Sequence, residues 1–127
     1  MSKKILIVDD EAHIRMLIEQ TLEELEDEDV EFLTAENGAD ALEIIKEEKP
    51  ELVFLDVMMP KMNGMEVCQR VKKELSLNEV YIVLLTAKGQ EIDRLKGQEV
   101  GADVYMTKPF NPETILKKAR SVLGLEK

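Results

Sequence analysis

Short apolar runs recur along the chain, and longer stretches with a different hydrophobic spacing separate them. Most residues in the runs are β-branched, leucine or aromatic, and each run is too short for a helix. The runs cover residues 5–8, 30–33, 52–55, 80–85 and 104–106. Because polar or turn-forming residues bound each run, the pattern predicts five buried β-strands.

Between the runs, apolar residues recur at the three- and four-residue spacing of a helix face. These stripes cover residues 14–25, 41–45, 65–75, 92–100 and 115–123, the fourth being the weakest. Asn111-Pro112-Glu113 predicts an N-cap, a proline in the first helical turn and an acid beside it. Asn37-Gly38 and Asn63-Gly64 are turn dipeptides ahead of the second and third helices.

The alternation of strand and helix is typical of a (βα)5 α/β domain. Connections of this kind give a parallel sheet that is covered by helices on both faces. Five strands are too few for a closed barrel, so we expect an open, doubly wound parallel sheet. Residues 1–127 are expected to form one domain with a core at about 3–123. Periodicity leaves the strand order open.

Polar side chains follow four of the five predicted strands. They are Asp9 and Asp10 after the first, Asp56 after the third, Thr86 after the fourth, and Thr107 and Lys108 after the fifth. Because parallel strands end at the same edge of a sheet, these side chains are expected to converge. The second strand ends in Thr34-Ala35 and offers no comparable group, although strand ends can also be polar for no functional reason.

The converging residue types indicate phosphoryl transfer. Asp9, Asp10 and Asp56 would repel one another, and a hard divalent cation such as Mg²⁺ relieves that repulsion. Lys108 adds a positive charge of the kind that binds phosphate oxygens. One carboxylate could accept a phosphoryl group covalently. The glycine-rich loops of nucleotide-binding sites are missing, so the phosphoryl group is expected to come from elsewhere.

Charge and composition narrow the function further. The chain has 27 acidic and 17 basic side chains, a net charge of −10, which argues against direct nucleic-acid binding. No apolar run approaches a membrane span or a signal peptide, so we expect a cytoplasmic protein without membrane insertion. Cys68 is expected to be a small core residue, and His13 an exposed residue in the first turn of a helix.

The motifs that follow the strands resemble the receiver domain of bacterial two-component response regulators. The resemblance extends from Lys3 to about Leu123. It rests on Ile5-Leu6-Ile7-Val8-Asp9-Asp10-Glu11, Ala35-Glu36-Asn37-Gly38-Ala39-Asp40-Ala41-Leu42, Leu55-Asp56-Val57-Met58-Met59-Pro60, Asn63-Gly64, Leu85-Thr86-Ala87, Gly101-Ala102-Asp103 and Lys108-Pro109-Phe110. Each motif is weak alone, but they occur together and in order.

The resemblance implies a flavodoxin-like sheet with strand order 2-1-3-4-5, an order for which a chemotaxis receiver is a known example. It implies that Asp56 is the phosphoacceptor and that a sensor histidine kinase or a phosphotransfer protein is the donor. Asp10, Asp56 and the backbone carbonyl of Met58 would hold Mg²⁺ (or Mn²⁺), and Asp9 would act mainly through water.

The resemblance also assigns roles around the phosphoryl group. Thr86 would bind a phosphoryl oxygen, Lys108 would pair with phosphate or carboxylate, and Lys108-Pro109 would be a cis peptide. Thr86 and Tyr105 would form the switch, altering the face made by the fourth helix, fifth strand and fifth helix. Met58 and Lys88 would tune the rate of dephosphorylation. From the residues alone, Thr86 could be an ordinary strand residue and Tyr105 an exposed aromatic.

Two rival functions remain. A phosphorylation-independent interaction module of the same fold would usually lack an acid or the lysine. A phosphatase of the haloacid-dehalogenase type would need Asp-x-Asp after a strand, where this chain has Asp56-Val57-Met58. The output is open: we expect a downstream protein target or an output domain, and the chain could act alone or form the amino-terminal part of a longer protein.

Overall fold

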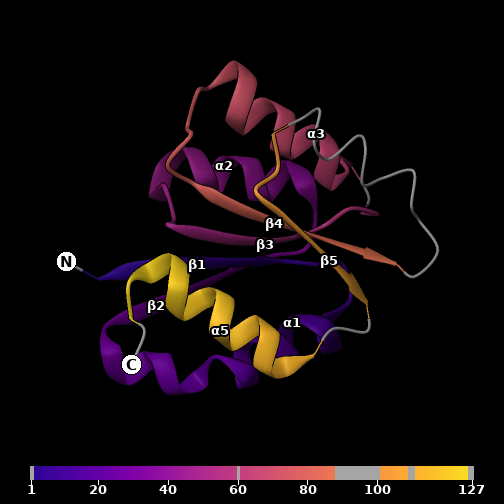
Figure 1. The fold of residues 1–127 in the computed structure, drawn as a ribbon. Helices are drawn as coiled ribbons and strands as arrows, with labels where there is room; N and C mark the ends of the chain where they lie inside the picture. Colours follow the sequence, from indigo (N-terminus) through magenta and orange to yellow (C-terminus); the bar gives the residue numbers. More distant parts are fainter. Residues whose placement is uncertain (1, 60, 88–100, 109–110, 126–127) are drawn as a thin grey trace.

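Five parallel strands form one sheet at the centre of the computed structural model, which describes residues 2–59, 61–87, 101–108 and 111–125. The strands are β1 (Lys3–Val8), β2 (Val30–Ala35), β3 (Leu52–Asp56), β4 (Tyr81–Ala87) and β5 (Val104–Lys108). Their order is β2-β1-β3-β4-β5 (Figure 1). This confirms the doubly wound, flavodoxin-like sheet and the strand order that the resemblance implied.

Helices cover both faces of the sheet. They are α1 (Ala12–Thr21), the 3₁₀ helix η1 (Glu23–Glu28), α2 (Gly38–Glu48), α3 (Gly64–Gln69), the π-helix η2 (Arg70–Glu74) and α5 (Pro112–Leu123). In Figure 1, α1 and α5 lie on one face and α2 and α3 lie on the other. The fourth predicted helical stripe, residues 92–100, lies wholly outside the described residues.

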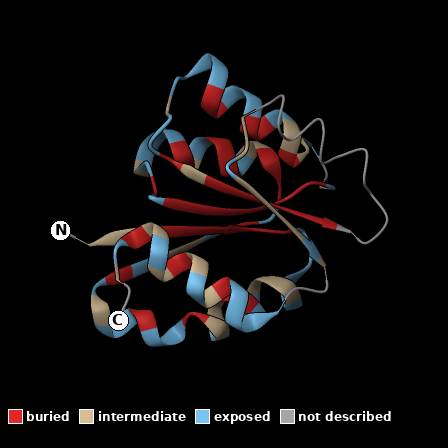
Figure 2. Ribbon diagram, viewed as in Figure 1, coloured by how far each residue is buried: buried red, intermediate tan, exposed pale blue. Residues whose placement is uncertain are grey.

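The apolar residues divide into two cores, one on each face of the sheet. Val53 and Leu55 of β3 pack with residues of α2 and α3, whereas Leu52 and Phe54 pack with residues of α1 and α5. Side chains alternate between the two faces along a strand, so a strand that is covered on both sides must be apolar throughout. Figure 2 shows the central strands as almost continuously buried.

The strands extend further than the apolar runs that predicted them. Asp56 is the last residue of β3, Lys108 is the last residue of β5, and Thr86 is the penultimate residue of β4. Backbone hydrogen bonding continues to the edge of the sheet whatever the polarity of the side chain. The polar residues therefore have the fixed backbone of a strand instead of the freedom of a loop.

The first predicted helix is shorter than its apolar stripe. It ends at Thr21 and continues as the 3₁₀ helix η1, in which the Leu25 N–H donates to the Leu22 carbonyl at 2.9 Å. Both leucines are buried in the core beside α1. Asp29, with φ of 62°, follows η1 in the left-handed region. Six residues of η1 include five acids, whose mutual repulsion disfavours a continued α-helix.

Side-chain caps define where three of the helices begin. Asn37 accepts from the Asp40 N–H, Asn63 forms a capping box with Glu66, and Asn111 accepts from the Glu113 N–H at 2.8 Å. The predicted cap at Asn111 is confirmed. Asn37 and Asn63, which the sequence suggested as turn residues, are also N-caps, since asparagine is a favoured residue at that position.

The acidic side chains are concentrated near one edge of the sheet. Residues 19–51 carry 14 acidic and 2 basic side chains, a net charge of −12, while the remainder of the chain carries 13 and 15. This segment includes η1, β2 and α2, and β2 is one of the two edge strands of the sheet. Among the described residues, no helix is long and apolar enough to cross a membrane.

Candidate functional site

Three carboxylates meet at the carboxyl edge of the sheet. Asp9 and Asp10 directly follow β1, and Asp56 ends the adjacent strand β3. One carboxylate oxygen from each residue lies within 4.8 Å of the others. Asp9 and Asp56 are buried, whereas Asp10 is exposed. The structure thus brings together the acids that the sequence placed at the ends of separate strands.

Lys108 joins two of these carboxylates. Its Nζ donates to Asp9 Oδ2 at 2.7 Å and to Asp56 Oδ1 at 3.1 Å. Lys108 stands at the end of β5, two strands away from β3, so its long side chain crosses the end of β4 to reach them. The ammonium therefore bridges the acids at the point where their repulsion would be greatest.

Burial and charge make Asp56 an unusual carboxyl group. Burial, assisted by the charge of Asp9, raises the pKa of Asp56 from 3.8 to about 6, although Lys108 opposes the rise. Burial lowers the pKa of Lys108, but its hydrogen bond to Asp9 and the charges of Asp56 and Asp9 outweigh this and leave the pKa raised. At neutral pH the site therefore combines an ionised Asp56 with a protonated lysine.

Asp9 is held by its backbone as well as by its side chain. Its N–H donates to the Ala35 carbonyl at 3.3 Å, and its Oδ1 accepts from the Glu11 N–H at 3.0 Å. Its carbonyl accepts from Arg15 Nη1 at 2.6 Å, while Arg15 Nη2 lies 3.5 Å from Glu36 Oε1. The end of β2 thus supports the site through Ala35, although it supplies no side chain of the expected kind.

The start of α3 packs directly against the backbone of Asp56. Gly64, the first residue of α3, lies so close that a Cβ built on it would be 2.3 Å from the Asp56 carbonyl oxygen. The Gly64 N–H donates to the Val57 carbonyl at 2.9 Å. Glycine is therefore required here for close approach, and its contact holds the end of β3 in place.

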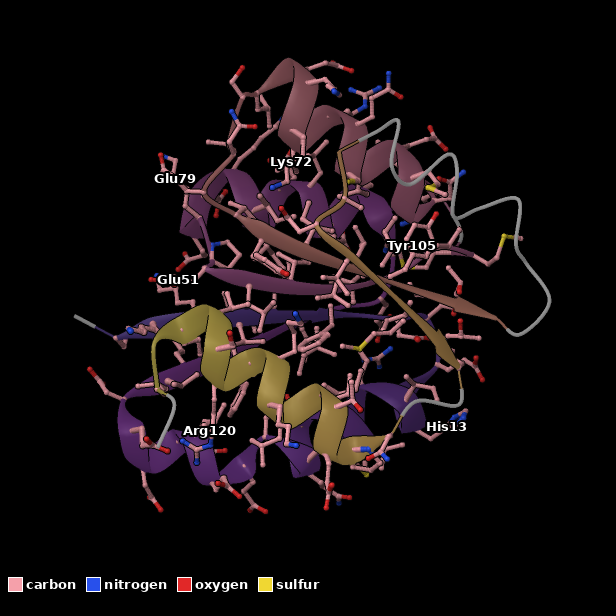
Figure 3. All side chains as sticks on the ribbon, in the orientation of Figure 1. His13, Glu51, Lys72, Glu79, Tyr105 and Arg120 are labelled. Carbon is pink, nitrogen blue, oxygen red and sulfur yellow. The ribbon has the colours of Figure 1, made fainter. Side chains whose placement is uncertain are left out.

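The remaining predicted site residues lie around this cluster. Thr86 is buried near the end of β4, and the Met58 side chain is exposed beyond β3. Tyr105 is partly buried and packs against the core beside α2 and α3, so it is not a fully exposed aromatic (Figure 3). Lys88 and Pro109 fall outside the described residues, so the proposed rate-tuning lysine and cis peptide stay predictions.

Two other residues behave as the sequence indicated. Cys68 is fully buried, and burial raises the pKa of its thiol to about 12, so it is a core residue and not a nucleophile. His13 is exposed in the first turn of α1, with Nε2 3.5 Å from Glu11 Oε2 (Figure 3).

Sequence reasoning missed the roles of Arg15 and Gly64 in supporting the site. Arg15 appears as one polar residue in an amphipathic helix, and no spacing rule connects it to the carbonyl of Asp9. Gly64 was recognised only as part of a turn dipeptide. A glycine at the first position of a predicted helix is the signal that could have suggested a close approach of another backbone segment.

Comparisons with known proteins agree with the fold and the motifs. A family model described as the response regulator receiver domain matches residues 5–120. The "Probable transcriptional regulator ycf27" of Porphyra purpurea is 49% identical over 121 residues, which are 95% of this chain and 47% of that protein. The chain is also 42% identical over 123 residues to the "Alkaline phosphatase synthesis transcriptional regulatory protein PhoP" of Bacillus subtilis, covering 97% and 49% of the two chains.

Solved structures give the same result. The chemotaxis response regulator CheY4 of Vibrio cholerae has 34% sequence identity and a TM-score of 0.81, with coverage of 96% of this chain and 99% of that one. This chain spans about half the length of the curated relatives that it matches. The family model matches most of the chain, and we conclude that the protein belongs to the response regulator receiver domain family of two-component signalling.

Proposed function

We propose that Asp56 accepts a phosphoryl group from a phosphohistidine of a sensor histidine kinase or a phosphotransfer protein. The observation that carries this proposal is the Lys108 ammonium bridging Asp9 and Asp56 inside a cluster of three carboxylates. Lysine and clustered acids at the carboxyl edge of a parallel sheet suit the binding of an anionic group together with a cation.

The donor set fits a small, hard divalent cation. Carboxylate oxygens are ligands that Mg²⁺ selects, and three of them lie within 4.8 Å of one another here. Burial, assisted by the charge of Asp9, raises the pKa of Asp56, so a bound cation would favour its ionised form. Asp10, Asp56 and the backbone carbonyl of Met58 would hold Mg²⁺ or Mn²⁺, with Asp9 acting through water. The ion would neutralise the carboxylates and the charge on the phosphoryl oxygens.

The residues of the chain then have separate tasks. An ionised Asp56 oxygen forms the new bond to phosphorus, while the bond between phosphorus and the donor imidazole nitrogen breaks. Lys108, already within hydrogen-bond distance of Asp56, binds a phosphoryl oxygen or the carboxylate. The Thr86 hydroxyl donates a hydrogen bond to another phosphoryl oxygen. The chain acts as a phosphoacceptor that assists its own phosphorylation and slow dephosphorylation.

The phosphorylated site signals through Thr86 and Tyr105. When Thr86 moves toward the phosphoryl group it vacates space, which the partly buried Tyr105 can enter. Such a change shifts the population of two conformations of the face that includes β5 and α5. A downstream protein target or an output domain would read that face. Two of the relatives are named as regulators of transcription, so in the whole protein an output domain would act on transcription.

The decisive experiment treats the protein with acetyl phosphate, with and without Mg²⁺, and measures its intact mass. We expect the mass of one phosphoryl group to be added only when Mg²⁺ is present. Asp56→Asn is the matched control and should gain nothing. An unmodified protein would favour the phosphorylation-independent interaction module, and steady turnover of a phosphomonoester would favour the phosphatase.

A further inference from the structure

Asp10 differs from the other two acids of the cluster. The Asp9 carboxylate is held by Lys108 and by the Glu11 N–H, and the Asp56 carboxylate is held by Lys108. Within the residues that the structure describes, the Asp10 carboxylate accepts no hydrogen bond and makes no ion pair. Its position in the cluster therefore depends on the backbone that carries it.

Arg15 holds that backbone. Its Nη1 donates at 2.6 Å to the carbonyl oxygen of Asp9, which belongs to the peptide group that joins Asp9 to Asp10. A peptide group is planar, so fixing its oxygen also fixes the direction in which the chain enters Asp10. The Arg15 side chain is only 15% exposed, and it projects from the first turns of α1, which pack on the same sheet.

We infer that Arg15 is a positioning residue that places the Asp10 carboxylate for cation binding. This inference rests on the proposed function, because it concerns the same site. The guanidinium does not contact the phosphoryl group or the cation in this role; it acts through the Asp9–Asp10 peptide. A charge-assisted hydrogen bond of this length is among the stronger ones that a protein makes, which suits it to hold an otherwise unsupported residue.

Two physical effects of removing Arg15 have opposite signs, and this makes the inference testable. Loss of a positive charge beside an acidic cluster should by itself strengthen cation binding through Coulomb's law. Loss of a positioning contact should weaken it, because Asp10 would no longer be held near the other carboxylates. Removing such a supporting contact usually lowers metal affinity by about 10- to 100-fold.

The test is the affinity for Mg²⁺, measured by titration calorimetry of the unphosphorylated protein. We expect Arg15→Met to bind Mg²⁺ about tenfold more weakly than the wild type. Arg15→Lys keeps a donor on a shorter side chain and should be intermediate. At saturating Mg²⁺, the rate at which acetyl phosphate modifies Asp56 should return close to that of the wild type, since Asp56 and Lys108 are untouched.

Glu36→Gln is the matched control. It removes the second partner of Arg15 but leaves the hydrogen bond to the Asp9 carbonyl, and the Glu36 side chain is 74% exposed. Its Mg²⁺ affinity should therefore equal that of the wild type. Equal weakening by Glu36→Gln would overturn the inference, because it would make surface charge the cause.

A double-mutant cycle with Asp10→Asn tests the route of the effect. If Arg15 acts through Asp10, Arg15→Met should weaken Mg²⁺ binding in the wild type and have no further effect in Asp10→Asn. The inference would be overturned if Arg15→Met lowered the Mg²⁺ affinity equally in the wild type and in Asp10→Asn. It would also be overturned if Arg15→Met bound Mg²⁺ as tightly as the wild type or more tightly. Either result would leave the proposed function intact. A wild-type protein that neither binds Mg²⁺ nor accepts a phosphoryl group would overturn the proposed function as well.

Discussion

Asp56 shows at the scale of one residue how a functional group can oppose folding. It is buried at the end of a wholly buried strand, next to Asp9, and its pKa is raised to about 6. In an unfolded chain the same carboxyl group would titrate near its ordinary value of 3.8. The folded state therefore holds the Asp56 proton more strongly than the unfolded state does, and ionisation at neutral pH costs folding free energy.

Asp56→Asn should raise the stability of the protein at neutral pH. One pKa unit corresponds to about 1.4 kcal/mol, so we expect the free energy of unfolding to rise by about 2 to 3 kcal/mol at pH 7.5. The cost is complete above pH 6 and is lost as the pH falls from about 6 toward 3.8. Urea unfolding of both proteins should show the difference shrinking by about half between pH 7.5 and pH 5.

A constant stability difference across this pH range would contradict the argument, because it would trace the gain to packing and not to ionisation. Asp40→Asn, at an acid in the first turn of α2 outside the cluster, provides a control. Asp40→Asn should not show a gain in the free energy of unfolding that shrinks as the pH falls.

Met58 and Lys88 are two further single residues, and we predict that they control the lifetime of the phosphorylated state. Each lies two residues after a site residue, and the Met58 side chain is 62% exposed. Replacing either should change the rate of autodephosphorylation more than the rate of phosphate acceptance. The measurement is the loss of phosphate from Asp56 after the donor is removed. Equal decay rates across a series of variants at both positions would rule this role out.

Gly64 is a further single residue whose replacement should have a specific effect. In Gly64→Ala the added methyl would meet the Asp56 carbonyl oxygen, so either α3 or the end of β3 must move. We expect a loss of stability of about 2 kcal/mol and slower phosphorylation of Asp56. Gln69→Ala, at the exposed end of the same helix, should leave both unchanged. Chemical denaturation and intact mass measure the two effects, and full activity in Gly64→Ala would show that the contact is not needed.

At the scale of elements, the sequence predicted most of the structure because each element has one dominant physical signal. Continuous apolar runs identified the strands, and helical spacing, supported by the Asn111 cap and two Asn-Gly turn dipeptides, identified the helices. The 3₁₀ helix η1 and the π-helix η2 were not predicted, because both retain apolar spacing compatible with an α-helix. These two segments depart from α-helical geometry because of repulsion between neighbouring acidic side chains and because of tertiary packing. The spacing of apolar residues records neither effect.

An ion pair with one buried partner, Lys72, links three parts of the fold. Lys72 of η2 is labelled in Figure 3. Its Nζ lies 2.9 Å from Oδ2 of Asp103, just before β5, and the Ile82 N–H of β4 donates to the same oxygen at 2.8 Å. The Lys72 side chain is 6% exposed and that of Asp103 is 30% exposed. Asp103 can therefore reach water if it loses its partner, whereas Lys72 has little access to water.

The two halves of this pair should respond unequally to substitution. Asp103→Ala leaves the buried Lys72 ammonium with only the Asn78 carbonyl, at 3.4 Å, and should cost about 3 kcal/mol of stability. Lys72→Met keeps the apolar length of the side chain and leaves Asp103 hydrated and bonded to Ile82, so we expect about 1 kcal/mol. Urea denaturation of the two variants and of the double variant gives the comparison. Equal costs would show that exposure does not decide the outcome.

At the scale of the whole molecule, the site depends on topology. Asp9, Asp56 and Lys108 are remote in sequence, and only the parallel sheet brings them to one edge. The pattern of residues predicted this meeting without the strand order, which came from the family resemblance. Arg15 could not be predicted in this way, because its contact with the Asp9 carbonyl depends on where a long side chain reaches after folding.

The acidic segment around β2 affects how separate molecules behave toward one another. An edge strand offers backbone groups to which another chain could add, and charged side chains along it prevent such pairing. Here the segment 19–51 supplies that repulsion, since it carries a net charge of −12. Near the sequence isoelectric point of about 4.6 the net charge of the whole chain is zero, so the repulsion between molecules is much weaker than at neutral pH. Light scattering should therefore show self-association at pH 4.6 and monodisperse protein at pH 7.5. Colloidal solubility is thus a second consequence of the acids that surround the sheet edge.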